Sequence, residues 1–129
     1  MKIELNKYLK EIGIDENYWL FDKTNQENDS RYRLNEDGFV DAEFFNLDTT
    51  LAIILYSYLS YFQENCLYGT PMGMETHQWE KIVAKMVEAF KLMLEEPDFP
   101  YDKTQSKNKQ KKIKYGLRLF IKYFNCLWY

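Results

Sequence analysis

The residues best suited to contact a charged ligand are concentrated in one segment near the C-terminus, which holds Lys107, Lys109, Lys111, Lys112 and Lys114. Lysine ammonium groups neutralise phosphates, and affinity of this kind falls with salt. The run contains no Arg, the usual residue for bidentate recognition of phosphates and bases. It also opens a predicted helix, where positive charge opposes the helix macrodipole. Three uses remain open: a contact with the acidic N-terminal region of this chain or a second copy, a solvated face, or a site for nucleic acid or an acidic partner.

The charge of the chain is strongly asymmetric. The formal net charge is −3, which does not favour general nucleic-acid binding. Residues 1–100, however, carry 9 Lys or Arg against 19 Asp or Glu, whereas residues 101–129 carry 8 against 1. A sequence divided in this way points to an electrostatic contact made by its C-terminal part.

The residues that could form a catalytic, metal-binding or phosphate-binding motif do not have the spacing that these motifs require. His77 is the only histidine, and no nucleophile motif accompanies it, so we expect an exposed histidine rather than a catalytic base. The acidic residues Glu36, Asp37, Asp41, Glu43 and Asp48 do not match a calcium loop, and no glycine-rich phosphate loop is present. The sequence therefore predicts no catalytic residues, no metal site and no cofactor.

The two cysteines, Cys66 and Cys126, each end an apolar helical pattern. We expect reduced, buried thiols, although a disulfide between them stays open. No run of 18 apolar residues occurs, and the first residues lack the apolar core of a signal peptide. These features predict a soluble protein of the cytoplasm.

Apolar periodicity predicts four helices. The first covers residues 2–12 and stops at Gly13. The second begins after Asp48 as its N-cap and is apolar nearly all round, which is typical of a bundle centre or an oligomer interface. Its predicted buried stripe consists of Leu51, Ile54, Leu55, Tyr58, Leu59 and Phe62. The third follows Thr76 as its cap and ends before Pro97, with a buried stripe formed by Trp79, Ile82, Val83, Met86, Val87, Phe90 and Leu94.

The fourth helix is expected over residues 107–126. Its predicted buried stripe consists of Ile113, Leu117, Phe120, Ile121, Phe124 and Trp128. Gly116 lies inside it, where glycine allows a neighbouring helix to approach closely at a cost of about 1 kcal/mol in helix propensity. The expected fold is mainly α, a compact helical bundle of about four helices in a single domain over residues 1–129. The Asp37-Gly38 turn also allows a small β-hairpin near residues 31–41.

Three stretches resemble a group of small uncharacterised proteins encoded by bacteriophages and prophages. They run from Gly38 to Ala52, from Gly69 to Phe90, and from Gly116 to Trp128, and so cover about two thirds of the chain. Tyr115 departs from the pattern, since the relatives have an acidic residue before this glycine. The resemblance implies a mobile-element origin and makes a role in counter-defence a natural expectation, but it carries no known activity.

Two functional hypotheses follow. The first is a non-enzymatic binding protein, an anti-CRISPR-like inhibitor of a host defence system that occludes a host protein or ribonucleoprotein and self-associates. The second is direct binding of nucleic acid or nucleotides through the five lysines of the run.

Overall fold

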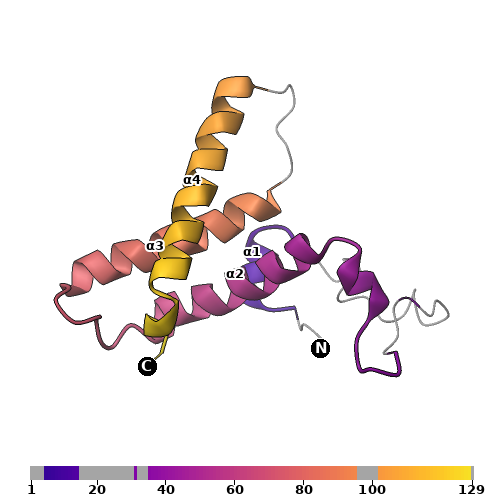
Figure 1. Ribbon diagram of the computed structural model, residues 1–129, viewed down its shortest axis with the longest axis horizontal. Helices are drawn as coiled ribbons and strands as arrows, with labels where there is room; N and C mark the ends of the chain where they lie inside the picture. Colours follow the sequence, from indigo (N-terminus) through magenta and orange to yellow (C-terminus); the bar gives the residue numbers. More distant parts are fainter. Residues whose placement is uncertain (1–4, 15–30, 32–34, 96–101, 129) are drawn as a thin grey trace.

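The computed structural model describes residues 5–14, 31, 35–95 and 102–128, and its ordered elements are helices (Figure 1). In chain order they are α1 (Lys7–Glu11), the 3-10 helix η2 (Asp41–Phe44), α2 (Leu47–Asn65), α3 (Thr76–Leu94), α4 (Lys103–Lys122) and the 3-10 helix η3 (Phe124–Cys126). The predicted class, a mainly α bundle of about four helices, is confirmed.

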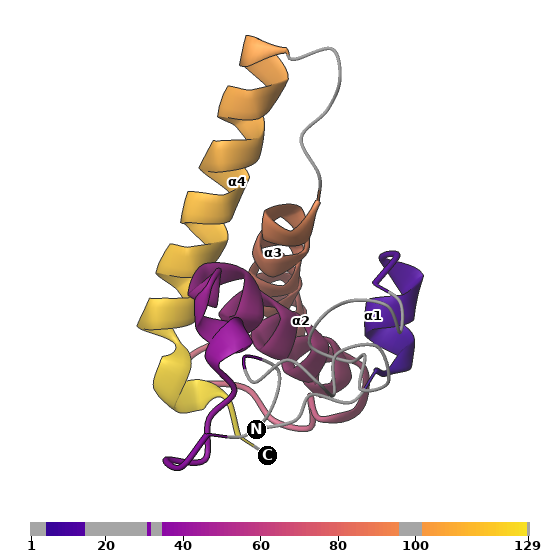
Figure 2. The same cartoon turned by 90° about the vertical axis from the view of Figure 1, so that its right-hand side faces the viewer.

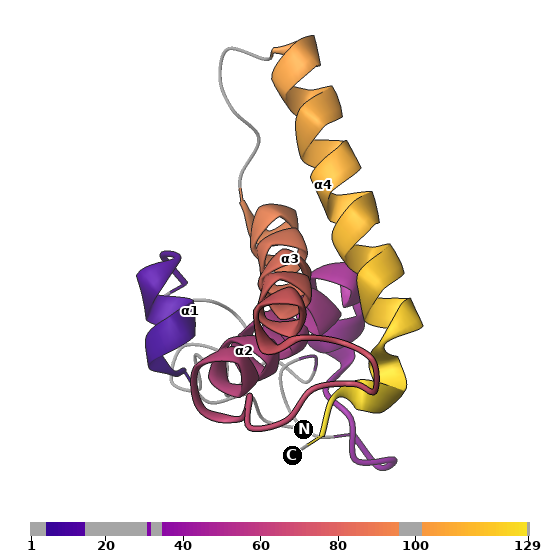
Figure 3. The ribbon, with the colours of Figure 1, turned by 90° about the vertical axis from the view of Figure 1, so that its left-hand side faces the viewer.

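Helix α3 is the centre of the packing, because it contacts both α2 and α4. The stripe predicted for it faces inward: Trp79, Val83, Met86 and Phe90 are buried. Two edge-to-face ring pairs join α3 to the end of α4, with centroids 5.4 Å apart for Phe90–Phe120 and 5.8 Å for Trp79–Tyr123. Helices α1 and α4 lie on opposite sides of the α2–α3 pair (Figures 2 and 3).

The predicted orientation of helix α2 is correct only in part: Leu59 is buried, and Leu55 and Phe62 pack against the core. The stripe expected to be buried includes Leu51 and Tyr58, yet these side chains are 48% and 69% exposed. The buried face also carries Ile53 and Tyr56, together with small or polar side chains such as Ser57. The physical reason is that a helix with apolar residues on nearly every side has no single face that periodicity can select.

Helix α1 is a short element held against α2 by polar contacts. Asn6 caps it by accepting from the backbone N–H groups of Tyr8 and Leu9, and its Nδ2 donates to the Ser57 hydroxyl at 2.9 Å. Leu9 is fully buried. The helix ends as predicted before Gly13, which adopts a left-handed φ of +91°. Residues 2–4 of the predicted 2–12 helix lie outside the described part of the chain, and the helix begins only at Lys7, after its cap residue Asn6.

Helix α4 crosses α3 at Gly116, where the predicted close approach is confirmed. A Cβ added at this position would stand 2.5 Å from the Lys85 carbonyl oxygen and even closer to Ala89 Cβ. From this crossing the N-terminal turns of α4 project beyond the other described helices in every view (Figures 1, 2 and 3). The crossing therefore fixes both how near α4 lies to α3 and how far its first half extends.

Several predicted helix ends are wrong. Helix α2 begins at Leu47 with Asn46 as its cap residue, so Asp48 lies in its first turn. Helix α3 is capped by Glu75, because the Glu75 and Gln78 side chains form a reciprocal capping box. Helix α4 begins at Lys103, four residues earlier than predicted, because Asp102 accepts from the backbone N–H groups of Thr104 and Gln105.

The end of the chain and the hairpin region also need correction. Helix α4 stops at Lys122, and the continuation as η3 leaves Ile121, Phe124 and Trp128 exposed instead of buried. Of the hairpin allowed near residues 31–41, residues 32–34 lie outside the described set. The described part contains a turn in which the Asn35 N–H donates to the Phe39 carbonyl at 2.7 Å, followed by η2, and it forms no strand.

Candidate interaction surfaces

The most strongly charged feature of the structure is one face of α4. The helix holds eight Lys or Arg residues and no Asp or Glu. At 100° per residue, six of them fall within an arc of about 100° and form a line about 28 Å long. We call this line the basic face; all six side chains are exposed, and they are Lys103, Lys107, Lys111, Lys114, Arg118 and Lys122.

The other two cations of α4, Lys109 and Lys112, turn toward α3. Lys109 Nζ lies 3.8 Å from the Glu95 carboxylate, and Lys112 Nζ lies 3.7 Å from the Glu88 carboxylate. Both separations are long and both pairs are partly solvated, so each contributes little to stability. Their effect is to link the two helices and to leave the basic face without a carboxylate of its own.

The five lysines singled out from the sequence are therefore divided by the structure. Lys107, Lys111 and Lys114 belong to the basic face and form no ion pair with any residue that the structure describes. Lys109 and Lys112 instead contact Glu95 and Glu88 toward the end of α3, two residues of the acidic part of the chain, residues 1–100. The sequence reading missed Lys103, Arg118 and Lys122, although their spacing of three and four residues from the others would have placed them on the same helical face.

The surroundings of the basic face are polar, with few rings. Tyr115, 51% exposed, lies at its edge, and Ile121 is exposed near its end. Nucleic-acid surfaces that bind single strands combine cations with several aromatic stacking platforms, whereas this face offers one ring. Lys103, Lys107 and Lys111 also stand on the projecting half of α4, where no other described helix restricts access (Figure 2).

Apolar side chains form two further exposed areas. One follows the outer side of α2, where Leu47, Leu51, Tyr58 and Tyr61 are each 43–69% exposed. The other lies after α4, where Phe124 and Trp128 are 59% and 75% exposed. Exposed apolar areas of this kind mark contact sites in many proteins.

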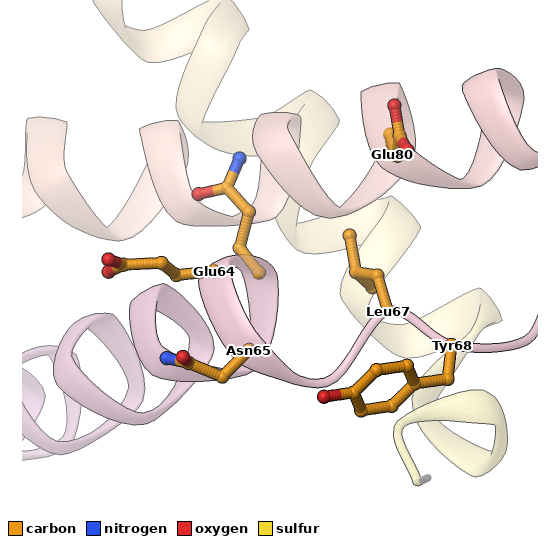
Figure 4. Close-up of a pocket in the computed structure, with 6 residues that line it drawn as sticks. Glu64, Asn65, Leu67, Tyr68 and Glu80 are labelled. Carbon is orange, nitrogen blue, oxygen red and sulfur yellow. The ribbon is translucent and has the colours of Figure 1, made fainter.

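An open depression of about 490 Å³ lies where α2 ends (Figure 4). Its lining comes from the last turn of α2, the following loop and α3, and includes Glu64, Leu67, Tyr68 and Glu80. The Glu64 carboxylate already accepts from the Tyr8 hydroxyl at 2.5 Å and from Lys7 Nζ at 3.0 Å. These two hydrogen bonds, that of Tyr8 being the stronger influence, lower the pKa of Glu64. The charge of Glu64 is thus already engaged by Lys7 and Tyr8.

The remaining candidates for chemistry are not assembled into a site. His77 is exposed in the first turn of α3, with Nδ1 3.2 Å from the Glu75 carboxylate. Cys66 and Cys126 are free thiols, each half-buried. Within the described ranges, no three His, Cys, Asp or Glu side chains are placed to hold a metal ion. The described helices likewise include none with the length and hydropathy needed to cross a membrane.

Comparison with known proteins adds no relative: no family model, no curated protein and no solved structure matches this chain.

Proposed function

We propose that this chain is a non-enzymatic binding protein of phage or prophage type that inhibits a host defence system, in the manner of an anti-CRISPR protein, by occluding a host protein or ribonucleoprotein. The observation that carries the proposal is the basic face of α4, a line of six exposed cations on a helix that projects from the body. Such a face is complementary to an acidic protein surface or to the RNA of a ribonucleoprotein.

Two further features support binding rather than turnover. The basic face is convex and lies on one helix, whereas sites for small substrates are concave and bring polar groups together from several elements. The apolar side chains exposed beside η3 supply the kind of anchor that interfaces use at their centre. Acting on such a target would place the protein in the host cytoplasm.

The test is charge reversal of the basic face. A Lys107→Glu/Lys111→Glu/Lys114→Glu variant should lose inhibition of the host defence system in a phage-plaquing assay and should no longer retain the target on an affinity column. The matched control is Lys10→Glu/Lys81→Glu/Lys91→Glu, which changes the charge equally at three exposed lysines outside α4. Inhibition that survives reversal of the basic face, or that is lost equally in the control, would contradict the proposal.

Direct nucleic-acid binding by the same face is the second candidate. The specific observation in its favour is that six cations follow one straight line with no acidic residue among them. If all six contact phosphates of a duplex, the logarithm of the affinity should fall with the logarithm of salt concentration with a slope of about −5. The three-lysine reversal should reduce that slope by roughly 3.

Nuclease treatment separates the two candidates. A target that stays on the column after complete digestion of RNA and DNA is a protein, as the first candidate requires. A target that is released by nuclease, together with binding of random duplexes by the purified chain, would favour the second.

A further inference from the structure

The outer face of α2 carries a regular apolar repeat. Leu47, Leu51, Ile54, Tyr58 and Tyr61 follow one another at spacings of 4, 3, 4 and 3 residues. This is the spacing at which side chains form the seam between two paired helices. We call these five residues the α2 seam; at 1.5 Å per residue it is about 21 Å long.

The seam is not part of the core of this chain. Leu47, Leu51, Tyr58 and Tyr61 are exposed, and Ile54 is half-buried. The neighbouring Leu55 and Phe62, by contrast, pack against the core and flank the seam. Helix α2 therefore buries Ile53, Tyr56 and Leu59 on its inner face and still keeps a second row of large apolar side chains exposed on its outer face. Such a second row is expected when the outer face is itself covered by another surface.

We propose that the α2 seam is the interface of a homodimer, in which α2 of a second copy packs against it in antiparallel orientation. A two-fold axis at Ile54 brings the two Ile54 side chains together. It also places Leu51 against Tyr58 of the second copy, and Leu47 against Tyr61 of the second copy.

The distribution of side-chain size favours this occupant and this orientation. Leucines occupy the first half of the seam and tyrosines the second half. Antiparallel pairing sets one leucine against one tyrosine at every outer layer, so the separation of the helices stays constant, whereas parallel pairing would set tyrosine against tyrosine. It also aligns the two helix dipoles favourably, and it leaves each tyrosine hydroxyl at the rim, where water can satisfy it.

The absence of charge from the seam argues in the same direction. Its five residues include no Asp, Glu, Lys or Arg, so a partner chosen by charge has nothing here to recognise. A two-fold dimer requires only that one patch be complementary to itself, which an uncharged patch satisfies without like-charge repulsion. The exposed parts of these side chains amount to the order of 400 Å² per chain, against about 800 Å² per partner in an interface of standard size. The dimer is therefore expected to be weak, with a dissociation constant in the micromolar range or higher.

Sedimentation velocity across a concentration series tests the proposal. The unaltered chain should shift from monomer toward dimer as its concentration rises to several hundred micromolar. A Leu51→Glu/Tyr58→Glu variant should stay monomeric throughout, with the same helical circular-dichroism spectrum. The matched control is Met72→Glu/Tyr115→Glu, which adds the same charge at two exposed positions away from the seam and should dimerise like the unaltered chain.

Crosslinking tests the orientation. In a Cys66→Ser/Cys126→Ser background, Leu47→Cys and Tyr61→Cys chains should form a disulfide with each other when they are mixed and oxidised, and neither should crosslink efficiently alone. A monomer at every concentration, a dimer that survives the Leu51→Glu/Tyr58→Glu change, or efficient crosslinking of Leu47→Cys chains on their own would overturn the proposal.

Discussion

Replacing Gly116 by alanine tests the crossing of α3 and α4. The added Cβ would lie 2.5 Å from the Lys85 carbonyl oxygen and closer still to Ala89 Cβ. Neither neighbour can rotate away, because one belongs to the backbone of α3 and the other is attached directly to it. The two helices must therefore separate by several tenths of an ångström along the contacts that surround the crossing.

Two opposing effects set the size of the loss. Alanine in a helix interior is more favourable than glycine by about 1 kcal/mol. Overpacking of a close contact costs about 1–3 kcal/mol, and a rigid backbone neighbour places this site at the upper end. The free energy of unfolding of Gly116→Ala should therefore fall by about 1–2 kcal/mol, which corresponds to a melting temperature about 4–8 °C lower for a chain of this size.

Urea unfolding followed by circular dichroism measures this difference, and Gly69→Ala is its control. Gly69 has open space around an added Cβ and no positive φ, so its substitution should change stability by no more than about 0.5 kcal/mol. A Gly116→Ala protein as stable as the unaltered chain, or more stable, would show that α3 and α4 do not approach as closely as described.

Three further predictions concern a cap, an acid-sensitive contact and the core. Asp102→Ala removes two hydrogen bonds to the first turn of α4, of 2.8 and 3.1 Å, and should cost about 1 kcal/mol in urea unfolding while lowering helicity; Asp102→Asn, which can still accept, should behave nearly like the unaltered chain. The lowered pKa of Glu64 means that its contribution to stability is present above the ordinary carboxyl pKa near 4.5 and is lost as the pH falls through the folded value. Stability measured between neutral pH and about pH 3 should thus fall more steeply in the unaltered chain than in Tyr8→Phe, and equal slopes would exclude the hydrogen bond to Glu64 as the cause. Met86→Ala, at a fully buried position of α3, should lower stability by about 2–5 kcal/mol, whereas Lys81→Ala on the exposed side of the same helix should have almost no effect.

The sequence was sufficient to predict which side of a helix is buried where apolar residues occupy only one side of that helix. Trp79, Val83, Met86 and Phe90 recur at helical spacing beside charged residues on the other side, so the buried face of α3 had no competitor. The role of Gly116 was predictable for a similar reason. An isolated glycine inside a strong helical pattern lowers helix stability, so its presence indicates a compensating use such as the close approach of a neighbouring helix.

Helix α2 could not be oriented from its own sequence. Both of its faces are apolar enough to be buried, so helical periodicity alone could not show that Leu51 and Tyr58 would be exposed while Ile53 is buried. The basic face of α4 was missed for a different reason. The predicted site was limited to five lysines between Lys107 and Lys114, and the spacing of three and four residues that places Lys103, Arg118 and Lys122 on the same helical face was not followed beyond that segment.

The projecting end of α4 gives the molecule a pronounced electric polarity that its net charge of −3 conceals. A polyanion meeting this protein at low ionic strength will be turned so that α4 arrives first, since the field at that end attracts while the rest of the chain repels. Collisions in the wrong orientation are discouraged before any contact forms. This separation of charge should therefore raise the association rate with a polyanion more than it raises the final affinity.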